Sequence, residues 1–286
     1  MKIRKRDDEP SEPRLDDTDE FRISLDSLGQ VGDFGALAHY ADPAYYTQCY
    51  RSRKHDVEYY VHLARARSES VLEFGCGNGR VTLAMAQAGA NVWGVDLSKP
   101  MLNDLEQHLN VSPAAVRERV TLVQGDMRDV GLERHFALVI APFNVMLHLY
   151  TRSDIERFLQ NVKHHLEPGG QFVCDVSLPL VADLARSPRR RYKAPSFIHP
   201  ETRQRIGYSE RFEYDPIRQL LLIWMEFVPE DGSAPWTIPL THRQFFPCEL
   251  ETHFHNAGFS SFQITSDFTE EPPGAHTDSL VITCTL

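Results

Sequence analysis

The sequence has few cysteines, and no two of them lie close together along the chain. Its five cysteines are scattered over 286 residues without any C-x-x-C spacing, which disfavours a disulfide framework or a cysteine zinc site. The close histidine pairs, His164 with His165 and His253 with His255, lack neighbouring cysteines or carboxylates arranged as a ligand set. We therefore expect no metal, and reduced thiols in a cytoplasmic protein.

Long apolar runs and an excess of positive charge are also missing. No run approaches the ~20 apolar residues of a membrane-spanning helix, and the charged first ten residues precede no apolar stretch, unlike a secretory signal. Acidic residues outnumber basic ones by 40 to 30, for a net charge of −10. We therefore expect no membrane and no nucleic-acid partner, because gripping a phosphate backbone requires positive surface.

The length and the 42% apolar content suit one large domain, or a core with an appended lobe. Charge, proline and serine dominate residues 1–30, which predicts a disordered leader. Helical spacing of apolar residues predicts an N-terminal helical arm over residues 31–70. From residue 71 short apolar runs alternate with helical patterns, which predicts a doubly wound parallel α/β core over residues 71–177.

The individual elements follow from the same patterns. In the core we predict strands at 71–74, 91–96, 120–124, 136–141 and 171–176 and helices at 80–88, 99–109 and 154–166. Residues 178–246 read as a connecting loop over 178–200 and an antiparallel meander with strands at 205–214, 220–228 and 236–246. Residues 247–286, with a helix at 249–257 and strands at 259–265 and 279–285, complete the core. The basic run at 186–191 is either a solvated face or an anion patch.

A glycine-rich loop follows the first core strand. It reads Glu73-Phe-Gly75-Cys-Gly77-Asn-Gly79, and it lies where open α/β sheets bind ligands. The spacing is not the G-x-G-x-x-G of a dinucleotide fingerprint. Glu73 would repel a diphosphate and suit a ligand that carries an ammonium group. A tight turn without a ligand is the alternative.

Two acids follow the next two strands. Asp96 ends the second strand, where a carboxylate accepts hydrogen bonds from ribose hydroxyls. Asp126, after the third strand, would accept from an adenine amino group while Met127 packs on the ring; the alternative is a simple turn acid. Together with Glu73 these residues predict a nucleoside ligand that is not a diphosphate, which disfavours a nicotinamide oxidoreductase.

These segments resemble the motifs of class I S-adenosylmethionine-dependent methyltransferases. The resembling stretches are Val71–Arg80, Val95–Ser98 with Met101-Leu102, Gly125–Arg128, and the turn Leu166–Gly170. The resemblance spans residues 71–176. It implies S-adenosylmethionine as cofactor, S-adenosylhomocysteine as product, and a seven-stranded Rossmann-like sheet whose last strand is antiparallel, with the meander as an insertion.

The flanking segments resemble bacterial small-molecule methyltransferases, including those that methylate sugar amines in natural-product biosynthesis. That resemblance implies an aromatic arm that closes over the cofactor, with Tyr50, or else Tyr46, near the reacting centre. It also implies that the meander helps to build the substrate chamber. The predicted cofactor contacts are Tyr46, Arg53, Glu73, Gly75, Cys76, Gly77, Asp96, Leu97, Met101, Asp126, Met127, Ala141 and Phe143.

The segment after the fourth strand supplies further catalytic candidates beside Tyr50. Methyl transfer is an in-line displacement that depends mainly on alignment and exclusion of water. His148 is either a general base for a hydroxyl or thiol or a packing residue. Asn144 either orients the substrate or satisfies backbone groups. On the meander, His242 or Arg243 would face the substrate, with Arg243 binding a carboxylate or phosphate or else forming a surface salt bridge.

The leading hypothesis is N-methylation of a small polar metabolite, with transfer to oxygen, sulfur or selenium through His148 as the alternative. A non-catalytic S-adenosylmethionine-binding partner protein is the alternative from another class. A nucleic-acid base methyltransferase is disfavoured, because the Ala-Pro-Phe-Asn sequence at 141–144 lacks the expected order of residues. The arm and an exposed sheet would both suit a homodimer.

Overall fold

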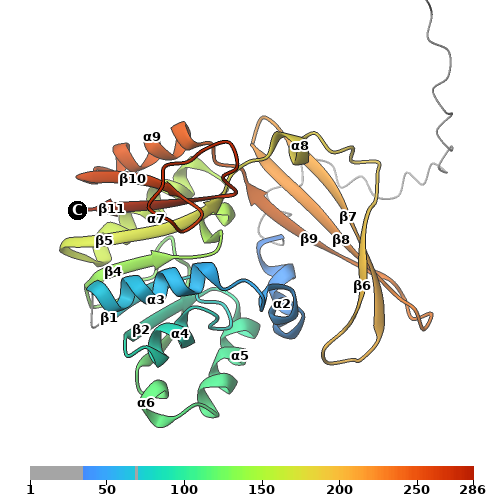
Figure 1. The fold of residues 1–286 in the computed structure, drawn as a ribbon, viewed down its shortest axis with the longest axis horizontal. Coiled ribbons are helices and arrows are strands. Elements are labelled where there is room, and N and C mark those ends of the chain that lie inside the picture. Colours follow the sequence, from blue (N-terminus) through green and yellow to red (C-terminus); the bar gives the residue numbers. More distant parts are fainter. Residues whose placement is uncertain (1–34, 68–69) are drawn as a thin grey trace, which may run out of the picture.

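The computed structural model describes residues 35–67 and 70–286, so the predicted leader over residues 1–30 lies outside the described residues. The described chain contains two sheets that lie side by side (Figure 1). The larger sheet comprises β1 (Ser70–Phe74), β2 (Asn91–Asp96), β3 (Val120–Gln124), β4 (Phe136–Ala141), β5 (Leu166–Ser177), β10 (Ser261–Ser266) and β11 (Ser279–Thr285). Its order is β10-β11-β5-β4-β1-β2-β3.

The topology of this sheet confirms the predicted fold class. Strands β1 to β5 pair in parallel, while β11 runs antiparallel to both β5 and β10. The strand order reverses beside β1, and at such a point the loops at the carboxyl ends of the strands diverge and leave a crevice.

Helices cover both faces of the larger sheet, so its central strands are apolar on both sides. Val71 of β1 belongs to a buried cluster that includes residues of α3 (His55–Arg67) and α4 (Thr82–Gln87). Its neighbour Leu72 belongs to the cluster on the other face, which includes residues of α7 (Arg152–His165) and α9 (Pro247–Ala257). The alternation follows from the two-residue repeat of a strand. Helix α5 (Lys99–Asn110) packs its leucines on β3, and the short helix α6 (Ala114–Arg117) follows it.

The smaller sheet differs from the prediction in one strand. Besides β7 (Arg205–Asp215), β8 (Leu220–Pro229) and β9 (Trp236–Arg243), it contains β6 (Tyr192–Ile198), preceded by the short helix α8 (Val181–Leu184). The expectation of a connecting loop over 178–200 was therefore wrong. In the sequence, Pro195 argues against a strand. The structure accommodates this proline because β6 is an edge strand, whose pairing with β7 shifts register between Ala194 and Phe197.

The N-terminal arm joins the two sheets. A helical turn at 35–37 leads into the 3₁₀ helix η3 (Ala38–Ala41) and then α2 (Pro43–Tyr50), which lies between the core and the smaller sheet (Figure 1). Asp42 caps α2 by accepting a hydrogen bond from the Tyr45 N–H. The Tyr45 ring is buried against Phe197 and Phe227 of the smaller sheet. The arm is thus anchored by apolar burial on its outer side.

Polar contacts anchor the other side of the arm. Asn78 of the glycine loop donates from Nδ2 to Thr47 Oγ1 at 2.7 Å and to Asp104 Oδ2 at 3.1 Å, and so links α2 to α5. The Arg80 guanidinium holds the buried Asp56 carboxylate with two hydrogen bonds, of 2.9 and 2.6 Å. No helix within 35–67 and 70–286 is both long and apolar enough to cross a membrane.

Candidate active site

A cavity of about 400 Å³ opens where the loops after β1, β2, β3 and β4 meet the arm. Its volume falls within the range typical of small-molecule sites, about 300–1,000 Å³. It is lined by Ala36, Leu37, Tyr40, Tyr46, Gly75, Gly77, Val95, Asp96, Leu97, Ser98, Met101, Gly125, Asp126, Met127, Arg128, Pro142, Phe143, Val145, His148 and Tyr150. The cavity therefore lies at the carboxyl edge of the parallel sheet, the position at which such sheets bind ligands.

The glycine loop turns sharply beneath this cavity. Gly75 has a φ of 70°, and a Cβ at this position would lie 2.3 Å from Val145 Cγ2. At Gly79, with a φ of 89°, a Cβ would lie 2.2 Å from Leu105 Cδ1. Both positions therefore require glycine, for backbone conformation as well as for packing.

Asp96 lies at the cavity wall with a constrained carboxylate. Its Oδ2 accepts from the Gly77 N–H at 2.7 Å, and its Oδ1 accepts from the Ser98 N–H at 2.7 Å. Burial raises the pKa of Asp96, against the opposing effect of these N–H donors. The Leu97 N–H is a third, weaker backbone donor to the carboxylate, and both oxygens keep acceptor capacity toward the cavity. Two adjacent hydroxyls of a ribose match that arrangement.

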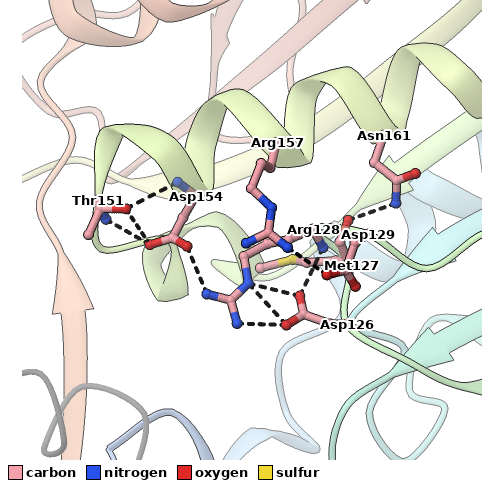
Figure 2. Close-up of polar contacts among 8 residues, drawn as sticks. All are labelled: Asp126, Met127, Arg128, Asp129, Thr151, Asp154, Arg157 and Asn161. Carbon is pink, nitrogen blue, oxygen red and sulfur yellow. Dashed lines mark hydrogen bonds and ion pairs between the residues drawn. The ribbon is translucent and has the colours of Figure 1, made fainter.

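Asp126 also lines the cavity, but it is paired (Figure 2). The Arg128 guanidinium donates to both oxygens of Asp126, at 3.0 Å from Nε and 2.6 Å from Nη2. Partial burial raises the pKa of Asp126, but the hydrogen bonds from Arg128 outweigh it, so the pKa falls below its ordinary value. Asp126 is therefore an ionised acceptor with most of its capacity used.

Three predicted cofactor contacts lie below the cavity and not on its wall. Glu73 is buried and accepts from Thr82 Oγ1 at 2.6 Å. Burial raises the pKa of Glu73 to about 8, opposed by that hydrogen bond, and Glu73 does not line the cavity. Cys76 packs among the leucines of α5, and Ala141 belongs to the apolar core.

The segment after β4 adopts a rare backbone conformation. Phe143 and Asn144 are consecutive residues with φ of 57° and 65°, and each such residue costs about 1–3 kcal/mol unless its surroundings stabilise it. The buried Asp175 accepts the Phe143 N–H at 2.8 Å, and Asn144 Oδ1 accepts the Ser177 N–H at 2.6 Å. Asn144 thus satisfies the backbone and does not line the cavity.

Asp175 is itself held from the opposite side. The hydroxyl of Tyr60 on α3 donates to the same oxygen, Oδ1, at 2.7 Å. Burial raises the pKa of Asp175 to about 6, opposed by the bonds from Tyr60 and the Phe143 N–H. The carboxyl group therefore connects α3, β5 and the Phe143–Asn144 turn, which carries Phe143 and Val145 to the cavity wall.

His148 lies at the far end of this segment, on the 3₁₀ helix η4 (Val145–His148), and it lines the cavity. Its Nε2 is 2.7 Å from the Tyr40 hydroxyl and its Nδ1 is 3.3 Å from the Tyr150 hydroxyl. Tyr150 in turn bonds Thr241 of β9. Burial lowers the pKa of His148 to about 4, and the nearby His39 adds to the effect. The imidazole is therefore neutral at physiological pH and a weak base.

Tyr46 lines the cavity, whereas Tyr50, the preferred candidate for the reacting centre, lies behind it. The Tyr50 hydroxyl is 3.3 Å from His39 Nε2, and its ring is 4.9 Å from that of Phe143. Arg53 also lies behind Phe143, with its guanidinium 4.9 Å from the ring centroid. These residues support the cavity wall without forming it.

The substrate candidates on β9 differ from each other. The His242 ring packs against His148 at 5.4 Å between centroids, one layer away from the cavity. Arg243 is nearly buried, forms an ion pair with Glu249 and donates to the Gln244 carbonyl. Of the two alternatives for Arg243, the structure shows the salt bridge, although it is nearly buried and not on the surface, and Arg243 does not line the cavity.

The structure thus brings only some of the predicted residues together. Those on the cavity wall are Tyr46, Gly75, Gly77, Asp96, Leu97, Met101, Asp126, Met127, Phe143 and His148; Tyr50, Arg53, Glu73, Cys76, Ala141, Asn144, His242 and Arg243 are not on it. Sequence reasoning missed Tyr40 and Tyr150 as site residues. It gave Arg128 no role, although Arg128 ends the segment Gly125–Arg128 that resembles a family motif. Tyr150 lies two residues after His148, so proximity to a predicted residue was its only signal.

The lining residues fit S-adenosylmethionine at the ends of β1 to β3. Asp96 offers the paired acceptor positions for a ribose, and Asp126 lies beside Met127 and Leu97, which suit an adenine. The remaining wall, from Phe143 to Tyr150 and the arm, would surround the sulfonium end. This placement follows from the donor set and apolar surfaces that the described residues present.

Comparison with known proteins gives an independent result. Residues 71–170 match the family described as a methyltransferase domain. A putative methyltransferase of Bacillus subtilis, YqeM, is 26% identical over 214 residues, which cover 73% of this chain and 81% of that protein. A dTDP-3-amino-3,4,6-trideoxy-alpha-D-glucopyranose N,N-dimethyltransferase of Streptomyces venezuelae is 30% identical over 126 residues, covering 44% of this chain and half of the relative.

A solved structure extends the similarity beyond the core. The CcbJ methyltransferase of Streptomyces caelestis superposes with a TM-score of 0.65 at 26% identity, and the alignment covers 81% of this chain and 88% of CcbJ. Since the methyltransferase-domain match ends at residue 170, this alignment necessarily includes residues outside that domain.

Proposed function

The chain is a class I S-adenosylmethionine-dependent methyltransferase, and we propose that it methylates an amine nitrogen of a small polar metabolite. The single observation that carries this proposal is the neutrality of the acceptor end of the cavity. Its polar groups are the hydroxyls of Tyr40, Tyr46 and Tyr150 and the imidazole of His148. The carboxylates that line the cavity, Asp96 and Asp126, come from the loops after β2 and β3.

None of these neutral groups suits the removal of a proton from a hydroxyl. Burial lowers the pKa of His148 to about 4 and raises the pKa of Tyr40 well above its ordinary value. An oxygen acceptor usually needs a base whose pKa lies near the working pH. An amine that has already lost its proton needs no base, because its lone pair can attack directly.

The chain's own residues then supply alignment and shelter from water. S-adenosylmethionine supplies an activated methyl group for an in-line displacement. Phe143, Val145 and the tyrosines line this part of the cavity, and a largely apolar wall favours the neutral form of an entering amine. Holding the two reactants in a productive geometry can account for about 7–11 kcal/mol of the barrier.

The relatives support an amine acceptor. The Streptomyces venezuelae relative is named as an N,N-dimethyltransferase of an amino sugar, and an amino sugar is a small polar amine. We propose that residues 31–70 form the lid, residues 71–177 and 247–286 the cofactor-binding core, and residues 178–246 the outer support of the acceptor chamber. The contact of His242 on β9 with His148 supports this division.

The test is a paired acceptor screen. Each amine, such as an amino sugar, is assayed beside the analogue that carries a hydroxyl in place of the amino group, with S-adenosylhomocysteine release and product mass as readouts. We expect turnover of amines only, with a rate that rises with pH as the acceptor amine loses its proton. Turnover of hydroxyl analogues alone would contradict the proposal. Binding of S-adenosylhomocysteine without any turnover would favour a non-catalytic partner protein.

A variant of His148 separates the two chemistries. Loss of a general base lowers rates by about 10²–10⁴-fold, so an enzyme that uses His148 as a base would lose nearly all activity in His148→Asn. For amine transfer we expect a loss of less than about tenfold, since only alignment is disturbed. Tm and S-adenosylhomocysteine affinity, measured on the same variant, control for damage to the fold.

A further inference from the structure

Arg128 links the floor of the cavity to the start of α7. Its guanidinium holds Asp126 with Nε and Nη2, and its third nitrogen, Nη1, donates to Asp154 Oδ1 at 2.8 Å (Figure 2). Asp154 is fixed in turn, because its Oδ2 accepts from the Thr151 N–H at 3.0 Å and from Thr151 Oγ1 at 2.7 Å. A chain of charge-assisted hydrogen bonds therefore runs from a helix cap to a cavity carboxylate.

The backbone of the same loop is held without Arg128. Asn161 of α7 donates to the Met127 carbonyl at 3.0 Å (Figure 2). It also donates to the Val130 carbonyl at 3.1 Å, and the Val130 N–H donates to the Asp126 carbonyl at 2.8 Å. Arg157 forms a second, more exposed bridge from α7 to Asp129. The Arg128 side chain is thus redundant for holding the loop, and what it fixes specifically is the Asp126 carboxylate.

The bonds from Arg128 leave few free hydrogen-bond acceptor positions on the Asp126 carboxylate. Asp126 Oδ1 accepts from the Arg128 N–H at 2.9 Å and from Nε at 3.0 Å, while Oδ2 accepts from Nη2 at 2.6 Å and shares Nε. Of about four acceptor positions on a carboxylate, one on Oδ2 remains. The carboxylate can accept one further donor in a fixed direction, and a ligand oxygen at that place would meet an ionised oxygen.

We propose that Arg128, held by Asp154, is a positioning residue that aims Asp126 at the 6-amino group of the cofactor's adenine and thereby selects a 6-amino purine over a 6-oxo purine. This inference rests on the proposed binding of S-adenosylmethionine. Asp126 itself makes the contact. Arg128 acts through Asp126, since its donors are directed at the two carboxylates, and Asp154 sets where the guanidinium lies.

The test compares S-adenosylhomocysteine with S-inosylhomocysteine, its 6-oxo analogue, by calorimetric titration. We expect the wild-type protein to prefer S-adenosylhomocysteine by at least roughly tenfold, and Arg128→Ala to reduce that ratio by roughly tenfold, as for loss of one well-placed hydrogen bond. Arg128→Lys, which retains the charge but lacks the planar fork, should give an intermediate ratio. Asp154→Ala should lower the ratio less than Arg128→Ala.

A matched control separates positioning from stability. Arg157→Ala removes the neighbouring bridge between the same loop and α7. It should lower Tm by an amount comparable with the test variants and leave the ligand ratio unchanged. If Arg128→Ala fails to fold or binds neither ligand, the Arg128→Lys ratio decides in its place.

An unchanged ratio in Arg128→Lys and Arg128→Ala, or equal binding of both ligands by the wild type, would overturn the proposal and leave the proposed function intact. A wild-type protein that binds no S-adenosylhomocysteine would contradict the proposed function itself, and this inference with it.

Discussion

The two halves of the cavity are held in different ways. At the ends of β2 and β3, Asp96 and Asp126 are fixed by donors close in sequence, such as the Ser98 N–H and Arg128. At the acceptor half, His148 is held by Tyr40, 108 residues away, and Tyr150 contacts Thr241, 91 residues away. The half with Asp96 and Asp126 can be predicted from the sequence because its hydrogen bonds are local. The acceptor half forms only when the arm, the core and the smaller sheet pack together.

The largest effect is expected where local bonding is densest. Asp96→Ala removes both ribose acceptor positions and leaves the Gly77 and Ser98 N–H groups without their carboxylate. We expect S-adenosylhomocysteine affinity to fall by roughly 100-fold or more, because hydrogen bonds to charged groups contribute about 1.5–3 kcal/mol each. Calorimetric titration measures it.

Asp129→Ala is the control for that comparison, because Asp129 is an exposed acid that pairs with Arg157 away from the cavity. Its affinity should match the wild type. Equal losses in Asp96→Ala and Asp129→Ala would show that charge alone, and not the geometry of Asp96, governs binding.

The next largest effect concerns the Phe143–Asn144 turn of the acceptor half. Asp175→Ala removes the acceptor for the Phe143 N–H and the Tyr60 hydroxyl, so the unfavourable backbone conformation can relax. We expect kcat to fall by about 10–100-fold, since small misplacements at a reacting centre have effects of that order. Asp175→Asn keeps an acceptor oxygen and should restore most of the rate.

Asp215→Ala provides the matched control for Asp175. Asp215 is also buried and also supports a turn, since its Oδ1 accepts from the Ile217 and Arg218 N–H groups. We expect a loss of Tm without a loss of kcat. If kcat falls in proportion to Tm in both Asp175→Ala and Asp215→Ala, Asp175 has no specific role in turnover.

A smaller effect is expected from a single hydroxyl in the acceptor half. Tyr40→Phe removes the contact of 2.7 Å to His148 Nε2 but keeps the ring on the cavity wall. We expect kcat to fall by roughly threefold to tenfold, the value of one hydrogen bond, with S-adenosylhomocysteine affinity unchanged. A change in affinity larger than the change in kcat would place Tyr40 in the cofactor half instead.

The smallest effect concerns stability and not turnover. Because burial raises the pKa of Glu73 from 4.5 to about 8, the folded protein binds a proton that the unfolded chain releases between these values. Stability from this group is therefore full below pH 4.5 and is lost as the pH rises through about 8. Glu73→Gln cannot ionise, so its Tm should decline less than that of the wild type between pH 5 and pH 8 in a thermal melt. An equal decline of Tm in the wild type and in Glu73→Gln would refute the raised pKa of Glu73.

Much of the fold was predictable because its signals are local. Apolar runs and their spacing located every strand of the larger sheet, and the antiparallel β11 agrees with the family resemblance. Strand β6 was missed, because Pro195 argues against a strand unless the strand lies at an edge. Whether a strand lies at an edge is decided by pairing with β7, which no local pattern records.

The cavity was predictable to a different extent in its two halves. Asp96, Asp126 and the glycines are on the cavity wall because strand ends fix their position. Tyr50 was preferred over Tyr46, and Arg243 was given a substrate anion as one of two possible partners, because sequence gives neither the rotation of α2 nor the partner Glu249. The spacing of residues in a motif does not show which face of a helix or strand packs against a segment that is distant in sequence.

The sequence by itself determined the α/β sheet, the glycine turn and the acids that follow β2 and β3, since backbone periodicity and strand ends place them. Only the tertiary structure decided that Glu73 is buried, with a raised pKa, and that His148 is a neutral, weakly basic group. The physical reason is that these properties depend on desolvation and on specific partners, and burial arises only when segments distant in sequence pack together.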